Sequence, residues 1–563
     1  MLFPRALALL PATALVLVEA ECHSRCEAFG DTLSIPNVSF VSSAHYTNGG
    51  NITLDGVVQS CAWGGGVGVR WTEATGDLCR VVVNVTTSPT SEVLVEAWLP
   101  DTWTGRFLAT GTGGLGGCVD YYALQNGVSS GFATLGTNAG HNGSAGFDFF
   151  LNQPETINDF GHRAIHVEAE VGKELLAQYY GSAPRYSYYA GCSTGGRQGF
   201  MNALMYPSDF DGVVTGAAAV SWLNIVASKA VLAQRLGWPD LSDARYVPPS
   251  SWRAIEAAMV KHLDPLDGVT DGVIDNPHAQ SFNFSLLRCG PDSLLDQNTC
   301  LTGAQAAAVA HVYEPVVSPA SGLEVLPGFD LGANTNVFSA NQSPRPGAAG
   351  LAYRVLDDYW RGAVYNTSAW DSRDFNLTQM DFAAHVNPGR INFGGGPYEG
   401  SHDLSAYKAR GGKLLAYHGR MDETVTSAIA TRTFDGVADA TGSSAEEMLD
   451  FYRLFAIPGH SHCTGGTGAW AMGQPTAKQS YLSFAGTGRF ADAEHSILMA
   501  MVRWVEDGVA PAWLVGTKFA GNDLVNGQVL AQRKHCPWPA LSRWDGIGDS
   551  NKAESWRCET PDQ

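Results

Sequence analysis

Short apolar runs alternate with amphipathic stretches along the first part of the chain. Apolar segments rich in β-branched and aromatic residues predict strands at 79–85, 91–99, 106–109, 131–135, 186–190 and 212–216. Apolar positions at helical spacing predict helices at 163–180 and 197–205. Regular alternation of strands and helices is typical of an α/β fold, in which helices cover both faces of a parallel sheet.

The pattern changes in the middle of the chain and then returns. From 222 to about 401 there is little alternation, and loops rich in proline separate the apolar segments. Strand-like runs reappear at 413–418 and 451–457. We therefore expect one α/β domain made of residues 21–221 and 405–563, interrupted by a lid at 222–404.

The N-terminus has the pattern of a secretory signal peptide. Arg5 precedes an apolar run over 6–18, and Val18-Glu19-Ala20 fits a cleavage site, so residues 1–20 are expected to be removed. No later stretch reaches the length of a transmembrane helix. Together these features predict a secreted, soluble protein.

Composition narrows the classes of partner. The net charge is −20 and there is no basic block, which argues against nucleic acid and anionic membranes as partners. Eleven cysteines fit an oxidising compartment, and their spacing does not resemble a zinc site, so structural disulfides are expected. N-x-S/T sequons at several positions also agree with a glycosylated, exported protein.

Residues Gly191–Gly195 form a G-x-S-x-G motif that follows a predicted strand and precedes a predicted helix. This pattern places Ser193 on a tight strand-to-helix turn, with its hydroxyl exposed as a nucleophile. The motif alone is weak, because glycine is abundant in the chain and a solvated turn would look the same. Its context favours a serine hydrolase of the α/β-hydrolase fold, with the N–H of Thr194 facing the developing oxyanion.

The remaining triad residues are expected after strands further along the chain, in the order serine, acid, histidine. Asp422 follows the 413–418 strand, and His462 follows the 451–457 strand. Asp435, Asp439 and Glu423 are rivals for the acid, and His460 is a rival for the base.

The oxyanion needs a second N–H donor besides that of Thr194. We expect the second donor from the glycine-rich turn 110–117, with Gly114 the best single candidate. The turn lacks the Lys-Ser/Thr ending of a phosphate-binding loop.

Cysteines adjoin two of these residues. Cys192 precedes Ser193, and Cys463 follows His462. If these cysteines are bonded, their Cα atoms lie within roughly 7 Å, and the serine and the histidine are held close together.

These motifs resemble the tannase and feruloyl esterase family of secreted α/β-hydrolases, over most of the chain from Cys26 to Cys558. The resemblance rests on the adjacent Cys192–Ser193 and His462–Cys463 pairs and on Asp422 after His418-Gly419. It implies the triad Ser193, Asp422 and His462 beside a Cys192–Cys463 bond. It also implies the further bonds Cys26–Cys79, Cys61–Cys118, Cys289–Cys300 and Cys536–Cys558. Cys22 is left over, although a Cys22–Cys79 pairing stays open.

An acidic loop at 264–275 combines aspartates with turn glycines. Hard oxygen ligands at short intervals suit Ca²⁺, although a solvated acidic turn would share this pattern. The family resemblance implies a structural calcium held by the side chains of Asp264, Asp267 and Asp271 and the carbonyls of Val269 and Val273. Such a calcium would order the lid and take no part in the chemistry.

The leading hypothesis is an esterase acting on plant phenolic esters, most simply hydroxycinnamoyl esters of cell-wall sugars. A tannase cleaving galloyl esters is the first alternative, and an inactive, calcium-dependent binding module on the same fold is the second. A serine peptidase would share the triad. Aromatic side chains of the lid could form the walls of an acyl pocket or the lid's own core: Trp222, Trp252, Tyr353, Tyr359 and Trp360.

Overall fold

The computed structural model describes most of the chain. The described residues are 12–54, 57–58, 61, 71–143, 146–319, 322, 324–341, 354–377, 401–474 and 492–560. Within these residues, no helix is both long enough and apolar enough to cross a bilayer.

A nine-stranded sheet runs through the described part of the chain, in the order β1-β4-β5-β7-β6-β8-β9-β12-β13. Its strands are β1 (Val38–Tyr46), β4 (Leu78–Ser88), β5 (Ser91–Pro100), β6 (Arg106–Thr110), β7 (Ala133–Thr137), β8 (Tyr186–Cys192), β9 (Gly212–Gly216), β12 (Lys413–Gly419) and β13 (Tyr452–Ile457). Every strand predicted from the sequence is among them. All pairs from β7 to β13 are parallel, so the carboxyl ends of β8, β12 and β13 lie at one edge.

The expectation of a wholly parallel sheet is wrong. Strands β1, β4, β5 and β7 pair antiparallel and form one side of a mixed sheet. Strand β1 escaped the sequence analysis because its residues, Val-Ser-Phe-Val-Ser-Ser-Ala-His-Tyr, are half-buried or exposed and show no apolar alternation. Edge strands with one neighbour need less apolar surface than central strands, so their sequence pattern is weak.

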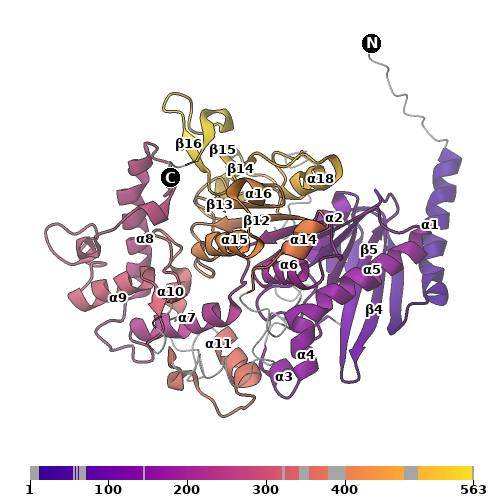
Figure 1. The fold of residues 1–563 in the computed structure, drawn as a ribbon, viewed down its shortest axis with the longest axis horizontal. Helices are drawn as coiled ribbons and strands as arrows, with labels where there is room; N and C mark the ends of the chain where they lie inside the picture. Colours follow the sequence, from indigo (N-terminus) through magenta and orange to yellow (C-terminus); the bar gives the residue numbers. More distant parts are fainter. Residues whose placement is uncertain are drawn as a thin grey trace.

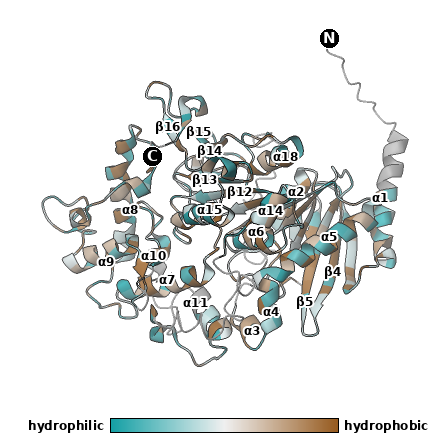
Figure 2. Ribbon diagram, in the orientation of Figure 1, coloured by the Kyte–Doolittle hydropathy of each residue, from teal (hydrophilic) through white to brown (hydrophobic). Residues whose placement is uncertain are grey.

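Alternate residues of the central strands point to opposite faces, and each face has its own core. Tyr189 of β8 belongs to one buried cluster, together with residues of α5 (Ala164–Tyr180), α6 (Thr194–Met205) and α15 (Ala428–Thr441). Its neighbours Tyr188 and Ala190 belong to a second cluster with α18 (Ile497–Asp507). Helix α2 (Tyr121–Ser129) packs on Trp98 in a third cluster. In Figure 2, strands β4 and β5 of the same sheet carry apolar (brown) segments beside helix α5.

The segment between β9 and β12 forms a largely helical body beside the sheet (Figure 1). It contains α7 (Trp222–Arg235), α8 (Pro249–Leu263), α9 (Gly303–Tyr313), α10 (Asn336–Asn341), α11 (Arg354–Tyr359) and the short strands β10 (Val316–Val317) and β11 (Glu324–Leu326). The largest buried cluster runs without a break from the sheet into these helices, through Trp222 and Trp252 among others. The lid is therefore packed firmly on the catalytic body, and its boundaries at 222 and 404 stay a prediction.

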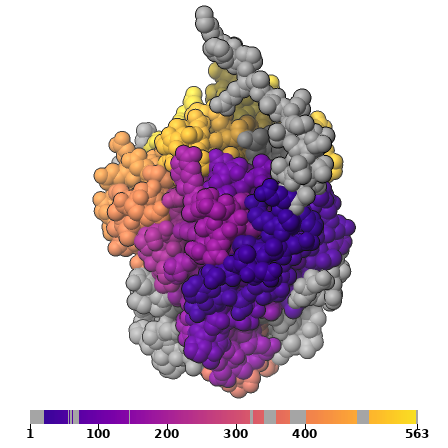
Figure 3. Space-filling view, turned by 90° about the vertical axis from the view of Figure 1, so that its right-hand side faces the viewer, coloured from indigo at the N-terminus to yellow at the C-terminus, as the bar shows by residue number. Residues whose placement is uncertain are grey.

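The C-terminal part adds two small antiparallel pairs that the sequence analysis did not foresee. Strand β14 (Leu514–Phe519) pairs with β15 (Val529–His535), and β16 (Leu541–Trp544) pairs with β17 (Trp556–Glu559). In Figure 3 this C-terminal part (yellow) lies toward the top of the molecule, and the first part of the chain (indigo to magenta) covers much of the face in view.

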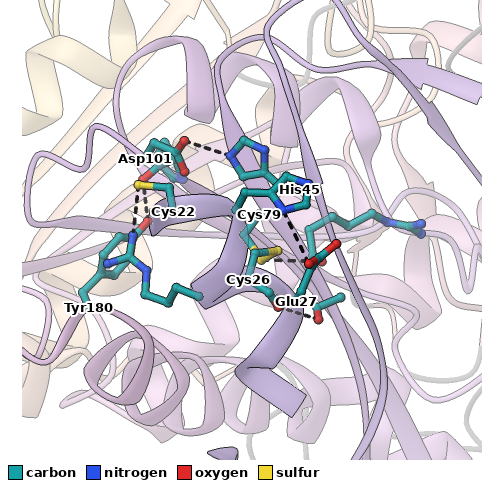
Figure 4. Close-up of a disulfide and its surroundings, with 12 residues drawn as sticks. Cys22, Cys26, Glu27, His45, Cys79, Asp101 and Tyr180 are labelled. Atoms are coloured by element: carbon teal, nitrogen blue, oxygen red, sulfur yellow. Dashed lines mark hydrogen bonds and ion pairs between the residues drawn. A yellow bond between two sulfur atoms is a disulfide. The ribbon is translucent and has the colours of Figure 1, made fainter. Parts of the chain in front are cut away.

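The described part of the chain contains all five disulfides that the resemblance implied: Cys26–Cys79, Cys61–Cys118, Cys192–Cys463, Cys289–Cys300 and Cys536–Cys558. Cys22 is the free cysteine, buried one helical turn before Cys26 in α1 (Ala12–Thr32), with Arg25 3.6 Å from its sulfur (Figure 4). Burial and the nearby Asp101 raise the pKa of the Cys22 thiol. The open alternative of a Cys22–Cys79 bond is therefore not the one formed.

Candidate active site

The turn between β8 and α6 holds Ser193 in a backbone conformation that few residues adopt. Its φ is 62° and its ψ is −120°, and the residue immediately begins helix α6. The Ser193 N–H donates to the carbonyl of Gly216 at 2.9 Å, and its own carbonyl accepts from the N–H of Arg197 at 3.0 Å. Such a strained turn at a strand end presents the hydroxyl away from the backbone, as a nucleophile elbow requires.

The glycines around Ser193 are needed because neighbouring backbone lies too close for a side chain. A Cβ on Gly195 would come within 2.9 Å of the carbonyl oxygen of Thr112, and a Cβ on Gly196 within 2.4 Å of that of Gly216. The G-x-S-x-G-G spacing thus lets helix α6 and the 110–117 turn approach the elbow directly.

His462 and Asp422 form the second half of the site. The Nδ1 atom of His462 lies 2.8 Å from Oδ2 of Asp422, and the other carboxylate oxygen accepts the N–H groups of Thr424 and Val425, each at 2.8 Å. The Asp422 side chain is completely buried, whereas that of His462 is 20% exposed. The acid is therefore fixed by its own turn, and its histidine partner still reaches solvent.

The electrostatics of this pair suit a general base. Burial alone would raise the pKa of Asp422, but the charges and hydrogen bonds of His462 and His418 hold it far below its usual range. Burial alone would lower the pKa of His462, but the Asp422 carboxylate more than compensates and raises it. Asp422 is thus ionised at any working pH, and it stabilises the imidazolium that proton transfer would create.

A disulfide joins the two halves of the site. The Cα atoms of Cys192 and Cys463 are 5.9 Å apart, so the residues next to them, Ser193 and His462, belong to turns that are bonded together. Cys463 has a φ of 62°, which matches the unusual backbone of Ser193 on the other side of the bond. Among the described residues no hydrogen bond joins the Ser193 hydroxyl to His462, and in free hydrolases this contact often tightens only around the substrate.

The structure separates the triad residues from their rivals. His460 is buried, and its ring stacks on Trp470 with centroids 5.9 Å apart, while burial lowers its pKa to about 3. Asp435 and Asp439 lie on helix α15, away from the strand-end turns. Glu423 follows Asp422 but makes no hydrogen bond to His462 in the described structure. Asp422 and His462 are the pair that the strand ends bring together.

Several N–H groups of the 110–117 turn, which is predicted to supply an oxyanion donor, are already engaged. Four of these N–H groups donate hydrogen bonds elsewhere, namely those of Gly111, Thr112, Gly116 and Gly117. Gly114 has a φ of +58° and open space at its Cβ position. Its carbonyl accepts a hydrogen bond from the Thr194 hydroxyl at 2.7 Å. This hydrogen bond places the Gly114 turn against the first residue of α6, and the N–H groups of Gly114 and Thr194 stay the predicted oxyanion donors.

Comparison with known proteins identifies the family. The family model described as tannase and feruloyl esterase matches residues 79–559. A probable feruloyl esterase B-2 of Aspergillus fumigatus is 36% identical over 560 residues, which cover 98% of this chain and 99% of that protein. The chain belongs to the tannase and feruloyl esterase family.

Solved structures agree with this assignment. Feruloyl esterase B from Aspergillus oryzae is 34% identical, with a TM-score of 0.84 over 95% of this chain and 100% of that one. A further esterase from Aspergillus oryzae, also 34% identical, has a TM-score of 0.85 over 96% of this chain and 100% of that one. Tannin acyl hydrolase from Aspergillus niger has a TM-score of 0.69 at 20% identity over 93% of this chain and 92% of that one, which shows the shared fold. The α/β-hydrolase fold with a large insertion is confirmed by these neighbours.

The acidic loop that the family resemblance marks for calcium is folded around backbone amides. The Asp264 carboxylate accepts the N–H groups of Asp271, Gly272 and Val273 at 3.0 to 3.3 Å, and Asp267 accepts that of Val269 at 2.9 Å. Burial and the nearby Asp275 raise the pKa of Asp267 to about 7. Crowded carboxyl oxygens of this kind are the donors that Ca²⁺ prefers.

The geometry of this loop does not by itself gather a metal site. In the described part of the chain, no group of three or more histidine, cysteine, aspartate or glutamate side chains is placed to hold a metal ion. The carboxylates of Asp264, Asp267 and Asp271 are of the donor type that suits calcium. The calcium and all five of its ligands, the carbonyls of Val269 and Val273 included, stay a prediction.

The aromatic residues considered for the acyl pocket are mostly lid core. Trp222, Trp252, Tyr359 and Trp360 are all buried, each at most 4% exposed. Tyr353 lies outside the described residues. These side chains stabilise the lid, in keeping with the alternative reading of their pattern.

Two residues beside the predicted triad have contacts that the sequence did not indicate, although His418 belongs to a motif named above. His418, at the end of β12, lies 3.3 Å from Asp422 and donates from Nε2 to the carbonyl of Val425 at 2.8 Å. Lys229 of α7 donates to backbone carbonyls of the same turn. The position of His418 on the strand before the acid was a usable signal, whereas a helical lysine nearly two hundred residues before the acid gave none.

Proposed function

We propose that this protein is a serine carboxylic ester hydrolase that cleaves hydroxycinnamoyl esters of plant cell-wall sugars through an acyl-enzyme on Ser193. The observation that carries the proposal is the 2.8 Å contact between His462 and the buried Asp422. The turn that holds His462 is bonded to the nucleophile elbow through Cys192–Cys463. This geometry supplies a nucleophile, a base and an orienting acid.

The proposed reaction has two halves. His462 accepts the Ser193 proton as the hydroxyl oxygen attacks the ester carbonyl, and the N–H groups of Thr194 and Gly114 stabilise the oxyanion. The C–O bond to the sugar then breaks, and the imidazolium returns its proton to the leaving alcohol. Water, deprotonated by His462, attacks the acyl-enzyme next and releases the phenolic acid and the serine hydroxyl.

The preference for a hydroxycinnamoyl group over a galloyl group rests on the relatives. Proteins named feruloyl esterase are 34–36% identical to this chain over nearly its whole length, whereas the tannin acyl hydrolase is 20% identical and informs only on fold. Cleavage of galloyl esters is the second candidate, because the family model covers both activities. The intact triad argues against an inactive binding module.

The test is a panel of initial rates on methyl ferulate, methyl caffeate and methyl gallate, for the wild type and for Ser193→Ala. We expect the highest kcat/KM on ferulate or caffeate, and no turnover above background in the variant. Preferred turnover of gallate would replace the substrate assignment with tannase. Near-native rates in a folded Ser193→Ala variant would refute the mechanism.

We also propose that the protein is exported and that its lid binds one structural calcium. Five disulfides and a leader-like N-terminus support export, and the acidic loop at Asp264, Asp267 and Asp271 supports the calcium. Calcium would cross-link the loop that follows α8 and would stay outside the reaction. N-terminal sequencing of the secreted protein and metal analysis after dialysis test the two proposals separately.

A further inference from the structure

A lysine from the lid is buried against the turn that carries the triad acid. Lys229 lies on α7 and is completely buried. Its ammonium group donates to the carbonyl of Thr424 at 2.7 Å and approaches that of Glu423 at 3.3 Å, and it lies 5.0 Å from the centre of the Phe329 ring. A buried ammonium is costly unless its hydrogen bonds are made, so these contacts are needed for the lysine to stay charged.

The carbonyls that Lys229 binds belong to the same peptide segment that orients the acid. The N–H groups of Thr424 and Val425 fix one oxygen of Asp422, and His462 binds the other. Lys229 therefore donates hydrogen bonds to carbonyl groups of this turn, and the Asp422 carboxylate accepts hydrogen bonds from its N–H groups. Movement of α7 would shift the turn, and with it the carboxylate that orients His462.

Charged groups surround this lysine on the side of the triad. The carboxylates of Asp422 and Glu423 act on Lys229 and favour its charged form, while burial lowers its pKa to about 8. Burial and the Asp422 charge raise the pKa of Glu423 to about 7. On the far side of Asp422, His418 and His462 also face the carboxylate, and His460 feels its charge. The Lys229 charge opposes the effect of Asp422 and Glu423 on His462.

We propose that Lys229 is a positioning residue for the triad acid: from the lid, its ammonium group binds the carbonyls of the 422–425 turn and so holds the carboxylate that orients His462. This inference rests on the proposed esterase function. It makes the inserted lid part of the catalytic apparatus, since the helix at its start supplies a cation that contacts the acid turn.

The experiment compares Lys229→Met, which removes charge and donors, with Lys229→Gln, which removes the charge but keeps an N–H donor. Lys408→Met is the matched control, because Lys408 also lies over an aromatic ring, Phe451, and donates to Ser443, but it contacts no part of the triad. The assay is hydrolysis of 4-nitrophenyl acetate from acid to alkaline pH, with folding checked by circular dichroism. The pKa of the His462 ring is measured in parallel by NMR.

Both Lys229 variants should move the acid limb of kcat/KM and the His462 pKa upward by about half a unit or more, because a nearby positive charge is lost. Lys229→Met should also lose about 10- to 100-fold in kcat through a misplaced acid, and Lys229→Gln should lose less. Lys408→Met should keep the wild-type profile. Folded Lys229 variants with a wild-type acid limb and kcat within about twofold would overturn the proposal.

Wild-type protein provides a readout that does not depend on the variants folding. Its kcat should fall as the pH rises through about 8, where the Lys229 ammonium loses its proton, and a rate that stays flat to about pH 10 would overturn the proposal. If the wild type hydrolyses no ester, the proposed function fails. The NMR titration of His462 then still tests the clamp, because the shift between wild type and Lys229→Gln does not require turnover.

Discussion

Removing the Cys192–Cys463 bond should separate its contribution to stability from its contribution to catalysis. The perturbation is the double variant Cys192→Ala/Cys463→Ala. The bond closes a loop of 271 residues, for which the chain-entropy relation gives about 5.6 kcal/mol at 25 °C. Such a loss is comparable to the whole stability of many domains, so the variant should unfold at much lower urea concentrations than the wild type.

Catalysis should suffer beyond this loss of stability, because the bond also sets the distance between the elbow and the histidine turn. We expect the folded fraction of the double variant to lose about 10- to 100-fold in kcat on methyl ferulate, with a smaller change in KM. The matched control is Cys536→Ala/Cys558→Ala, whose bond closes 22 residues and is worth about 3 kcal/mol by the same relation.

The assay is urea unfolding followed by fluorescence, combined with kcat measured well below the unfolding transition. The control should lose stability but keep its kcat. If the Cys192–Cys463 variant is folded and retains the wild-type kcat, the bond does not position the triad and this reasoning is wrong. If both variants lose kcat equally, the effect is one of general stability.

Three further outcomes are expected. The kcat/KM should fall on acidification with a midpoint above about 6.5, because His462 must be neutral to act as a base and Asp422 raises its pKa; a midpoint near 4 would exclude this histidine. Gly114→Ala should lower kcat by about 100-fold, because it strains a residue at φ +58° and displaces the predicted oxyanion donor. Gly113 has open space at its Cβ position and no positive φ, so Gly113→Ala should keep the wild-type kcat, and equal effects of the two variants would refute the donor assignment. Calcium at a hundredfold excess over its Kd should stabilise the wild type against unfolding by about 2.7 kcal/mol, and an unchanged Tm after chelation would show that the lid holds no structural calcium.

The sequence predicts the parallel part of the fold well because its strands are buried on both faces. Such strands are continuous apolar runs, as in Gly212–Gly216, and each ends at a turn with distinctive chemistry. The proposed triad follows from this regularity, since the carboxyl ends of parallel strands lie at one edge of the sheet. Strand β1 carries no such signal, because most of its side chains are polar or exposed.

Contacts across the lid were beyond the reach of the sequence pattern. Lys229 reads as an ordinary helical lysine, and only the packing of α7 against the acid turn shows where its ammonium group lies. The lid tryptophans show the same limit of the sequence pattern. Trp252 and Trp360 could line a pocket or fill a core, and their complete burial is a property of the packed lid.

Active-site labelling shows whether Ser193 is the nucleophile. Incubation with a fluorophosphonate, followed by peptide mass spectrometry, identifies the residue that attacks. We expect one modified residue, Ser193, with labelling slowed when methyl ferulate is present and abolished in His462→Ala. Labelling at another serine, or none in an enzyme that still hydrolyses methyl ferulate, would contradict the assignment of the nucleophile.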